Sequence, residues 1–486
     1  MELQQLLQHV KTLSTVGSLS REISGIASDH RTVAPKHIFI CYQGVNVDGH
    51  TFIPQAIEHG ATTIVGEHPP PVDLPTDITY IQVPNGRIAL SYIAANWHSN
   101  PADQLKLIGI TGTNGKTSTA YLTHSILESA GLKAAIMGTV DYRYGDVLVP
   151  ASAGTTPDPI TLHRLFKQIV DAGLDYVIME TSSQGLAQHR LAGLTFDTAV
   201  FTNLTQDHLD YHQTMEEYLN AKLMLFQQIR PEHGLAILNV DDPAFNQIRQ
   251  QVKASILTYG VENRADITVH EPESTLKGLA FTAMLKEGSI RAKLRLLGHY
   301  NIYNALAAIG ISQHHGCSPE AIQSGLASTV VPGRFQLIDR GQDFAVVVDY
   351  AHTPDGLENL LTAARKVAKN RLICVFGCGG DRDRSKRPKM GNISTAIADH
   401  SVVTSDNPRT EDANRIIDDI LEGLPDDANY QCITDRRKAI SHAIGMAAPG
   451  DLVAIAGKGH ETYQEINGEK FNFDDCKVAA EFLDVL

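Results

Sequence analysis

The sequence predicts an α/β protein of three domains: a small N-terminal α/β domain, a central domain built on a P-loop-type parallel sheet with helices, and a C-terminal Rossmann-like domain. Short β-branched runs alternate with helical patterns through the second and third parts of the chain, which is typical of parallel sheets. The 486 residues also suffice for about three domains of roughly 150 residues each. Breaks at 99–101 and 331–333, rich in proline and glycine, set the expected domains at residues 1–100, 101–332 and 333–486.

The expected elements follow in chain order. In the first domain they are strands over 37–42 and 62–65 and a helix over 86–97. In the central domain they are strands over 105–110, 134–137, 176–179, 198–201 and 235–238, and helices over 118–130 and 216–226. In the third domain they are strands over 344–348, 372–376, 401–404 and 452–455. Helical patterns between these strands predict the crossovers of parallel sheets.

The segment that follows the first central strand carries the strongest functional signal. Residues 108–118 read as a strand end, a glycine turn and a helix start. Backbone N–H groups freed by glycine and the positive helix N-terminus suit a polyphosphate, and Lys116 and Thr117 suit its γ-oxygens and Mg²⁺. The loop is a variant, because the usual first glycine falls at Ile110 and glycine instead stands at Gly112. The sequence therefore predicts that a nucleoside triphosphate binds here.

Composition narrows the class of partner. Apolar residues make up 43% and charged residues 20%, an ordinary globular balance. The net charge of −14 argues against nucleic acid, since no basic excess exists to displace counterions. The start lacks the pattern of a signal peptide, and no apolar run is long enough to span a bilayer. The six scattered cysteines then favour reduced thiols in a cytoplasmic protein.

Polar clusters follow many of the expected strands. They occupy residues 180–183, 202–203, 349–352, 377–382, 405–409 and 456–461. Ligands of open α/β sheets bind beyond the carboxyl ends of the strands. The second and third domains are therefore expected to face each other across one cleft.

Individual residues in and near these clusters leave alternatives open. Glu180 suits Mg²⁺ or a helix N-terminus. His208 lies among acids at 207–212 and suits a second metal. Lys222 lies on the helix expected over 216–226, and residue type alone explains it as a lysine on a solvated helix face. Asn301, one turn before Asn304, could read a base edge or cap its helix.

Four arginines are predicted in loops near the cleft. They are Arg334, Arg382, Arg387 and Arg409. Guanidinium groups bind carboxylates and phosphates well. The simpler explanation of each of these arginines is a solvated side chain on the protein surface. That explanation is weakest for Arg382 and Arg409, which directly follow strand ends.

Several motifs together resemble the ATP-dependent Mur ligases. The matching segments, in order over almost the whole chain, are 111–117, 207–212, 298–304, 349–352 and 457–461. Asp406-Asn407-Pro408-Arg409 resembles the branch that adds meso-diaminopimelate as the third residue of the peptidoglycan stem peptide. Two positions depart from the family pattern: His30 stands for a serine and Gln184 for a histidine.

The resemblance implies a role for each matching residue. ATP would be held by Gly112, Thr113, Asn114, Gly115, Lys116, Thr117, Asn301, Arg334 and Asp349. The Mg²⁺ ions would be held by Thr117, Glu180, His208 and Lys222 as a carbamate, and the catalytic residues would be Lys116, His208 and Lys222. UDP-MurNAc-L-Ala-D-Glu would be held by His30, Thr155, Thr156, Ser182, Gln188 and Arg190. The amino acid would be held by Arg382, Asp406, Asn407, Pro408, Arg409, Gly457 and Glu461.

The expected activity is amide formation driven by ATP with Mg²⁺, through an acyl phosphate, in cytoplasmic peptidoglycan precursor synthesis and hence in cell wall biogenesis, cell shape and cell division. The expected partners are the two small-molecule substrates, with no nucleic acid and no membrane, and the protein is expected to be a monomer. Two alternatives stay open. One is a Mur-like ligase for lysine, ornithine or a substrate outside the cell wall, and the other is a non-catalytic nucleotide-binding subunit.

Overall fold

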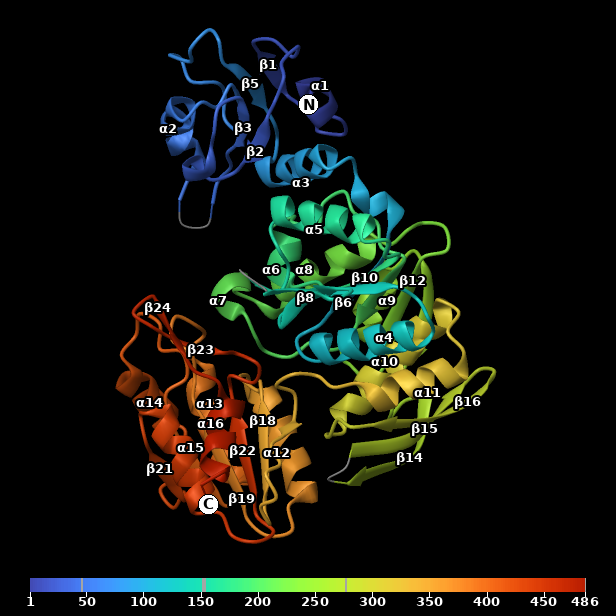
Figure 1. Cartoon of the computed structure of the whole chain (residues 1–486), viewed down its shortest axis with the longest axis vertical. Coiled ribbons are helices and arrows are strands. Elements are labelled where there is room, and N and C mark those ends of the chain that lie inside the picture. Colours follow the sequence, from blue (N-terminus) through green and yellow to red (C-terminus); the bar gives the residue numbers. More distant parts are fainter. Residues whose placement is uncertain (45–46, 151–153, 276–277, 486) are drawn as a thin grey trace. The chain divides into compact units, whose positions relative to one another are not determined.

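The computed structural model describes residues 1–44, 47–150, 154–275 and 278–485 (Figure 1). The chain divides into two compact units. The first comprises Met1–Gly109, Lys133–Asp197 and Met224–Gly234, and the second comprises Ile110–Leu132, Thr198–Leu223 and Leu235–Leu486. The predicted α/β class is confirmed, and the boundaries near residues 100 and 332 stay predictions.

The N-terminal part of the first unit is a five-stranded sheet in the order β1-β5-β4-β3-β2. Its elements are α1 (Leu3–Leu6), β1 (Ser14–Val16), β2 (Gly25–Ala27), β3 (His37–Ile40), α2 (Ile53–Glu58), β4 (Thr63–Gly66), β5 (Thr79–Gln82) and α3 (Gly86–Trp97). Successive side chains of β3 point to opposite faces of the sheet. Ile38 and Ile40 pack with residues of α1 and α3 on one face, and Phe39 packs with residues of α2 on the other. The predicted strands and helix of this part are confirmed.

The central sheet has eight strands in the order β13-β12-β11-β6-β10-β7-β8-β9. They are β6 (Lys106–Thr111), β7 (Ala134–Met137), β8 (Asp141–Tyr144), β9 (Val147–Pro150), β10 (Tyr176–Glu180), β11 (Thr198–Phe201), β12 (Leu235–Asn239) and β13 (Ser255–Tyr259). The pairs β7–β10 and β11–β12 are parallel, as predicted. The pair β12–β13 is also parallel, although β13 was not predicted, and β8 and β9 form an antiparallel extension that the sequence did not reveal.

Helices follow many of these strands along the chain. They are α4 (Lys116–Ser129), α5 (Pro159–Asp171), α6 (Ser183–Ala187), α7 (Leu209–His212), α8 (Met215–Gln227), α9 (Phe245–Gln251), α10 (Tyr300–His314) and α11 (Pro319–Ser328). In the second unit, α4 packs closely against both α10 and α11. A Cβ at Gly325 would lie 2.4 Å from the Cα of Ile126, so the approach of α11 to α4 requires glycine there. An antiparallel sheet of β14 (Thr268–Thr275), β15 (Gly278–Leu285) and β16 (Gly288–Leu294), also not predicted, precedes α10.

The C-terminal part is a six-stranded sheet in the order β17-β18-β22-β19-β20-β21. The strands are β17 (Gln336–Leu337), β18 (Ala345–Asp349), β19 (Leu372–Phe376), β20 (His400–Val403), β21 (Tyr430–Cys432) and β22 (Leu452–Ala456), and β23 (Tyr463–Ile466) with β24 (Glu469–Asn472) forms a hairpin. The helices are α12 (Pro354–Val367), α13 (Lys386–Ile397), α14 (Ala413–Leu421), α15 (Arg436–Gly445) and α16 (Asp475–Leu483).

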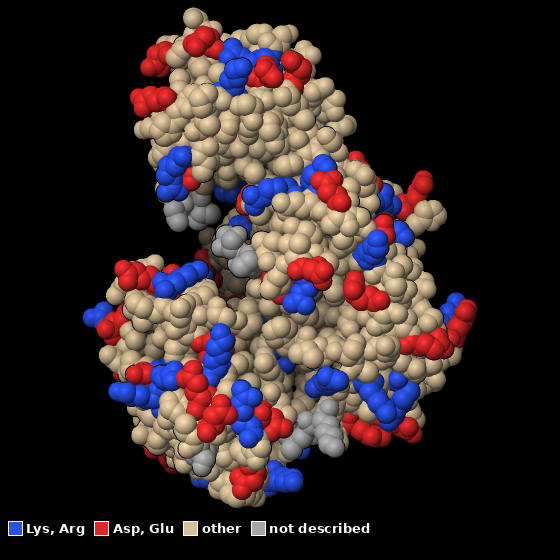
Figure 2. All heavy atoms as spheres, viewed as in Figure 1, with Lys and Arg blue, Asp and Glu red and all other residues tan. Residues whose placement is uncertain are grey.

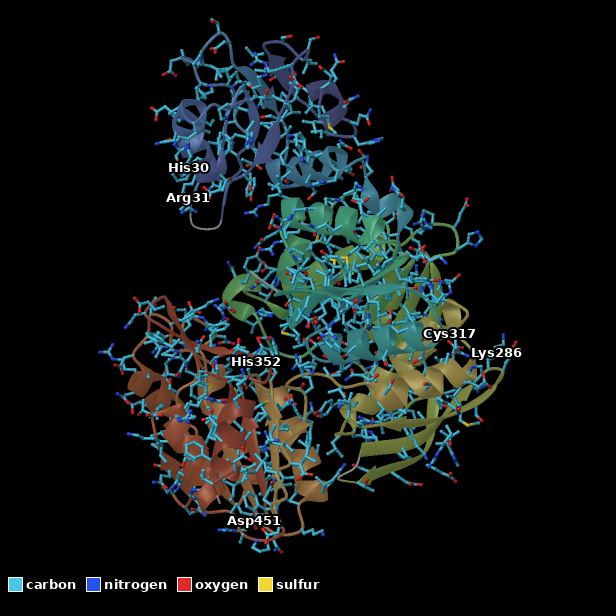
Figure 3. All side chains as sticks on the ribbon, viewed as in Figure 1. His30, Arg31, Lys286, Cys317, His352 and Asp451 are labelled. Carbon is cyan, nitrogen blue, oxygen red and sulfur yellow. The ribbon has the colours of Figure 1, made fainter. Side chains whose placement is uncertain are left out.

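Two apolar layers, one on each face of this sheet, make it doubly wound. Side chains of α12, α13 and α14 cover one face, and those of α15 and α16 cover the other. Every strand pair except β17–β18 is parallel, so the carboxyl ends of β18, β19, β20 and β22 share one edge. Figure 3 shows His352, just after β18, at one end of this sheet and Asp451, just before β22, at the other.

Acidic and basic side chains are interspersed over the face drawn in Figure 2. All six cysteines are free thiols. Within the described ranges, no helix has the length and apolar character that crossing a bilayer requires.

Candidate active site

The phosphate loop between β6 and α4 is shaped by two glycines. Gly112 has φ +150° and Gly115 has φ +86°, conformations that residues with a Cβ rarely adopt. A Cβ at Gly112 would lie 1.8 Å from Thr202 Oγ1, and one at Gly115 would lie 2.3 Å from Asn304 Oδ1. The displaced glycine of the motif is therefore required by the contact of the loop with the end of β11.

Lys116 and Thr117 begin α4 directly after this turn. The Lys116 ammonium group donates to the carbonyls of Gly112 (2.9 Å) and Thr113 (2.8 Å), so it lies over the loop. Thr117 Oγ1 accepts a hydrogen bond of 3.2 Å from the guanidinium group of Arg334. Lysine, hydroxyl and arginine thus gather at a helix N-terminus, the combination that suits a triphosphate.

Asn114 ties the loop to its surroundings within the second unit. Its backbone N–H donates to Asn203 Oδ1 (2.8 Å), and its side-chain amide donates to Asp355 Oδ2 (2.5 Å) in the first turn of α12. The second bond joins the phosphate loop to the start of α12, the helix that follows β18, and the cleft expected between the second and third domains stays a prediction. Burial raises the pKa of Asp355, and the Asn114 amide lowers it in part.

Asn301 is held in the interior by two side-chain hydrogen bonds. The side chain is fully buried, its amide donates to the Leu297 carbonyl (2.6 Å), and its oxygen accepts from Asn304 (2.9 Å). Asn304 is the side chain that packs against Gly115. Asn301 therefore neither caps α10 nor presents an open amide here; it orients Asn304, a residue that the predicted set omits.

Asp349 is the last residue of β18, and Arg334 lies in the turn that precedes β17, the strand paired with β18. Asp349 accepts backbone N–H bonds from Phe335 (2.7 Å) and Ala351 (2.8 Å), and burial raises its pKa. The Arg334 guanidinium lies 4.7 Å from the centroid of the Tyr350 ring, which orients its fork toward Thr117. The predicted pair thus consists of one residue that contacts the phosphate loop and one that fixes the backbone of its neighbours.

His208 is the residue directly before the short helix α7, and its backbone lies in the left-handed region, with φ +55°. A non-glycine residue in this conformation often marks a functional site. Its backbone N–H and ring both meet the Asp207 carboxylate, at 2.9 Å and 3.4 Å. Desolvation lowers the pKa of His208, which favours the neutral imidazole that a metal ion binds.

Lys222 is buried, contrary to the explanation as a solvated helix face. The side chain is 2% exposed, and its ammonium nitrogen lies 4.0 Å from the centroid of the Tyr218 ring. Burial, together with the positive charge of Lys116, places the pKa of Lys222 well below that of an ordinary lysine. Tyr218 in turn contacts Thr113 Oγ1 at 3.2 Å, so this aromatic ring links the lysine to the phosphate loop.

Glu180 and the residues expected to hold the uridine substrate lie in the first unit. Glu180, 1% exposed at the end of β10, accepts from the backbone N–H (2.9 Å) and hydroxyl (3.0 Å) of Thr139. It does not begin α6; that helix is capped by Ser182, whose hydroxyl accepts from Gly185 N–H. The alternative of a helix N-terminal carboxylate is therefore wrong.

A hydrogen-bond network joins several of those substrate candidates. Thr156 bonds to Ser182 through both hydroxyls (3.1 Å), and Thr155 bonds to Thr139 (3.0 Å). Arg190 donates to Gln188 (2.8 Å) and to the Thr156 carbonyl (2.5 Å). His30, in the N-terminal sheet, stacks on Phe52 with ring centroids 4.4 Å apart and stays a separate prediction.

Two loops after β19 and β20 carry the arginines expected to bind the amino acid. Arg409 has φ +52° and donates to the Gly380 carbonyl (2.7 Å), and Arg382 is exposed in the loop after β19. A Cβ at Gly380 would lie 1.9 Å from the Pro408 carbonyl oxygen, so the two loops touch through backbone. Pro408 therefore acts as a packing surface for the first loop.

Arg387 corrects one prediction, since it lies in α13 and not in a loop. Its side chain is fully buried and pairs with Glu411 (2.8 Å) and Asp419 (2.8 Å). Glu411 also accepts the N–H of Asp381 (2.6 Å). This arginine consequently binds no ligand directly and clamps the loops that carry Arg382 and Arg409.

Asn407 and Glu461 meet at the ends of β20 and β22 through a lysine that was not predicted. The Lys458 ammonium group donates to Asn407 Oδ1 (2.9 Å) and to Glu461 Oε2 (2.8 Å). Asp406 lies nearby: burial raises its pKa, but Lys458 and Arg436 lower it further, to below the usual value. Gly457 has φ +117°, and a Cβ there would lie 2.6 Å from Asp406 Oδ2.

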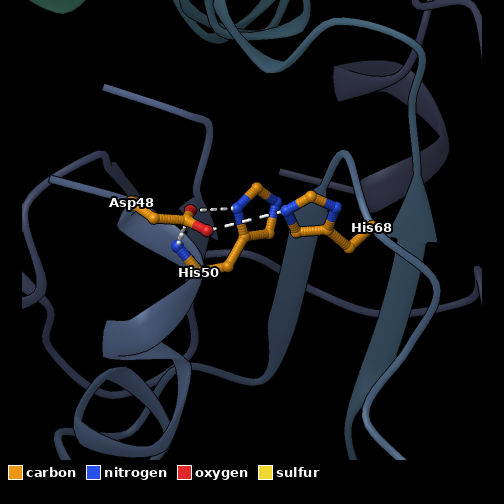
Figure 4. Close-up of side chains that lie close together, drawn as sticks. All are labelled: Asp48, His50 and His68. Carbon is orange, nitrogen blue, oxygen red and sulfur yellow. Dashed lines mark hydrogen bonds and ion pairs between the residues drawn. The ribbon is translucent and has the colours of Figure 1, made fainter. Parts of the chain in front are cut away.

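A second group with metal-ligating side chains lies in the N-terminal domain: Asp48, His50 and His68 (Figure 4). His50 Nδ1 lies 2.6 Å from Asp48 Oδ1, and its Nε2 accepts the Glu67 backbone N–H at 2.8 Å. Because Nε2 is an acceptor, Nδ1 carries the proton and donates to Asp48. The chemistry of this group therefore fits a turn-stabilising histidine and not a metal ligand.

Together, the variant phosphate loop and the polar edge of the C-terminal sheet suit a protein that binds a nucleoside triphosphate and a second, charged substrate. Three family profiles match the chain: Mur ligase family, catalytic domain, at residues 22–98; Mur ligase middle domain at 110–312; and Mur ligase, glutamate ligase domain, at 333–459. The chain belongs to the Mur ligase family, whose members are ATP-dependent, ADP-forming amide ligases.

Comparison with individual relatives points to one branch of the family. The chain is 47% identical to the UDP-N-acetylmuramoyl-L-alanyl-D-glutamate–2,6-diaminopimelate ligase of Syntrophomonas wolfei, over 99% of each chain. A solved structure of a ligase with that name superposes with a TM-score of 0.70 at 32% identity, covering 100% of this chain and 99% of the other. The MurF ligase of Thermotoga maritima in complex with ADP shares the fold, with a TM-score of 0.64 at 17% identity over 95% and 97% of the two chains.

Sequence reasoning missed Tyr218, Asn304 as a loop contact, and Lys458. Only Lys458 had a local signal, because it stands between Gly457 and Gly459 directly after a strand. The other two act through neighbours that are distant in the sequence.

Proposed function

We propose that the protein adds meso-diaminopimelate to UDP-MurNAc-L-Ala-D-Glu with ATP, as a cytoplasmic step of peptidoglycan precursor synthesis. The relatives that carry this activity in their names match the chain from end to end. The single structural observation that supports the proposal is the hydrogen bond from Arg334 to Thr117. It joins the phosphate loop to the sheet whose strand ends carry Asn407 and Arg409.

ATP fits the phosphate loop as a substrate. Substitution of Gly112 or Gly115 would fill the turn that brings backbone N–H groups to a phosphate, and Lys116 and Arg334 supply positive charge. On binding, the Lys116 ammonium group would exchange the carbonyls of Gly112 and Thr113 for phosphate oxygens. The Arg334 guanidinium, supported by Tyr350, would contact the γ-phosphate side of the nucleotide.

Mg²⁺ fits the donor set that the family resemblance implies. Thr117 supplies a hydroxyl, Glu180 a carboxylate and His208 a neutral imidazole, all suitable for a divalent cation beside phosphate. Lys222, buried and with a lowered pKa, presents the neutral amine that reacts with CO₂ to form a carbamate and release a proton. When bound, the metal neutralises charge on the phosphate oxygens.

The proposed chemistry has two steps that balance in atoms and charge. A D-glutamyl γ-carboxylate oxygen attacks the γ-phosphorus of ATP; the new O–P bond forms as the bond to the β-phosphate oxygen breaks, giving an acyl phosphate and ADP. The neutral amine then attacks the acyl carbon, and the tetrahedral intermediate releases inorganic phosphate and one proton. Positioning and charge stabilisation supply the catalysis, as in other phosphoryl transfers.

Discrimination among amines is assigned to the arginines of the third domain. A diamino dicarboxylic acid has one more carboxylate than lysine or ornithine, and a guanidinium group binds a carboxylate bidentately. Arg409 is held in position by the Gly380 carbonyl and by Glu465, 3.4 Å away. Arg382 and Arg409 together therefore favour the dicarboxylic substrate.

The test is phosphate release from ATP with UDP-MurNAc-L-Ala-D-Glu and a panel of meso-diaminopimelate, lysine and ornithine. We expect turnover with meso-diaminopimelate, and a Lys116→Ala variant that loses it. Arg409→Ala should raise the KM for meso-diaminopimelate by about tenfold or more, since a charged hydrogen bond contributes about 1.5–3 kcal/mol. Turnover with lysine or ornithine but not with meso-diaminopimelate would contradict the substrate assignment.

Two other outcomes would support the alternatives. Turnover that needs an acid other than the UDP-linked dipeptide would indicate a Mur-like ligase outside the cell wall. Full activity of a complex that contains Lys116→Ala would indicate a non-catalytic subunit. The monomeric state and the location in the cytoplasm stay predictions.

A further inference from the structure

Lys458 is a fully buried cation in the loop after β22, between two glycines with positive φ. Both glycines allow close packing: a Cβ at Gly457 would meet Asp406 Oδ2 at 2.6 Å, and one at Gly459 would meet Tyr350 Cβ at 2.7 Å. With the loop held against these neighbours, the lysine side chain points inward beneath the strand ends. A buried ammonium group without partners would be very costly, so its contacts decide its role.

The lysine fixes the orientation of the Asn407 amide. Asn407 Oδ1 receives two donors, Lys458 Nζ at 2.9 Å and the Glu465 backbone N–H at 2.9 Å. Neither group can accept a hydrogen bond in return, so the amide oxygen must face them. The amide nitrogen is consequently turned toward Glu461 Oε2, at 2.9 Å.

The lysine also engages one of the two oxygens of the Glu461 carboxylate. Oε2 accepts from both Lys458 Nζ (2.8 Å) and the Asn407 amide (2.9 Å). In the part of the chain that the structure describes, no hydrogen bond reaches Oε1, and the Glu461 side chain is 15% exposed. Oε1 of Glu461 therefore has no protein donor among the described residues, and the second amide hydrogen of Asn407, a residue that is 2% exposed, has no protein acceptor there.

We propose that Lys458 is a positioning residue for the incoming amino acid: it holds Asn407 and Glu461 so that Glu461 Oε1 accepts from the substrate ammonium group and the Asn407 amide donates to a substrate carboxylate. This inference rests on the proposed function for the place of the amino acid, and it adds the residue that organises its recognition. A purely structural lysine would only neutralise the acids around it, and its loss would lower stability without a selective effect on one substrate.

The test compares Lys458→Met with the wild type in the full-length enzyme by steady-state kinetics. We expect the KM for the amino acid to rise by about tenfold to a hundredfold, the effect of losing hydrogen bonds to charged groups. The KM values for ATP and for the UDP-linked substrate should stay within about twofold of wild type. Unchanged KM for the amino acid in a folded Lys458→Met variant would overturn the proposal.

A matched control removes another cation from a buried acid of the same sheet. Arg371 pairs with Asp451 at 2.7 Å, at the opposite edge from the strand ends (Figure 3). Arg371→Met should lower the melting temperature and leave the KM for the amino acid unchanged. An equal rise in KM for both variants would show that loss of stability alone explains the effect.

A double-mutant cycle tests the path through Glu461. In a Glu461→Gln background, Lys458→Met should change the KM for the amino acid by less than about twofold, because its partner is already altered. Full additivity of the two substitutions would contradict the proposal. Should Lys458→Met fail to fold, Lys458→Gln keeps a donor to Asn407 without the charge and carries the same predictions.

The assays of the wild-type enzyme distinguish failure of the proposed function from failure of the role proposed for Lys458. If the wild type uses an amine other than meso-diaminopimelate, the substrate assignment fails, and the Lys458 test is performed with the amine that is used. If the wild type turns over no amine, a crystal structure of Lys458→Met decides: an Asn407 amide still 2.9 Å from Glu461 would overturn the positioning role, and a rotated amide would support it.

Discussion

His163 on α5 offers a sharp test of the relation between packing and pH in this protein. The side chain is 1% exposed, and both ring nitrogens lack a hydrogen-bond partner in the described structure. The ring packs edge-on against Phe166, with centroids 5.7 Å apart. Burial, with a smaller effect of His98, lowers the pKa of His163 from 6.5 to about 3. A histidine thus fills a space suited to an apolar side chain.

The sign of the pH effect follows from proton binding. Between pH 3 and pH 6.5 the unfolded chain protonates His163 and the folded chain does not. The free energy of unfolding therefore falls as the pH falls through this window. At pH 5.0, which is 1.5 pH units below the unfolded pKa, His163 lowers stability by about 2 kcal/mol relative to pH 7.5.

The perturbation is His163→Leu, assayed by urea unfolding at pH 7.5 and pH 5.0. At pH 7.5 the variant should be more stable by about 1–3 kcal/mol, because two unpaired polar nitrogens are removed from the interior. At pH 5.0 the advantage should grow by about a further 2 kcal/mol. Phe166→Leu, which alters the same packing without a titrating group, should show a difference from wild type that is equal at both pH values. A His163→Leu advantage that does not grow on acidification would refute the reasoning.

Three further predictions concern the site. Lys222→Met should lower kcat by at least about a hundredfold, since it removes the amine that would form the carbamate, and added formate or acetate should restore part of the activity if a carboxylate is what is missing. Arg387→Met removes the buried guanidinium group that pairs with Glu411 and Asp419 and leaves Arg384, which is largely exposed, as their ion-pair partner. It should lower the free energy of unfolding by about 1–3 kcal/mol and raise the KM for the amino acid more than that for ATP. Urea unfolding and steady-state kinetics are the measurements, and an unchanged KM would contradict the clamp. Gly112→Ala places a Cβ 1.8 Å from Thr202 Oγ1 and should raise the KM for ATP by about tenfold or more, whereas a wild-type KM would show that the turn yields at little cost.

Local pattern predicted most of the parallel framework. The strands over 134–137, 198–201 and 372–376 and the helix over 86–97 match the structure residue for residue. These runs are buried and apolar, so short-range composition decides them. The antiparallel sheet β14–β16 and the hairpin β23–β24 were not predicted. The strands β14 and β24 are exposed along most of their length, whereas β15 and β16 bury alternate residues, a signal that the prediction did not use.

The sequence by itself determined that a triphosphate loop is present, that glycine is displaced to Gly112, and that polar residues follow successive strands. These features depend on neighbours along the chain, so residue type and spacing are enough to predict them. Only the tertiary structure decided that Lys222 is buried against Tyr218, that Asn301 acts through Asn304, and that Arg387 pairs with acids inside the domain. The tertiary structure also explains why Gly112 is required: a Cβ there would clash with the hydroxyl of Thr202, the residue that follows β11. Burial and ion pairing depend on residues far apart in the chain. Lys222 and Arg387 could therefore be explained from the sequence as solvated side chains, and the fold shows that both are buried.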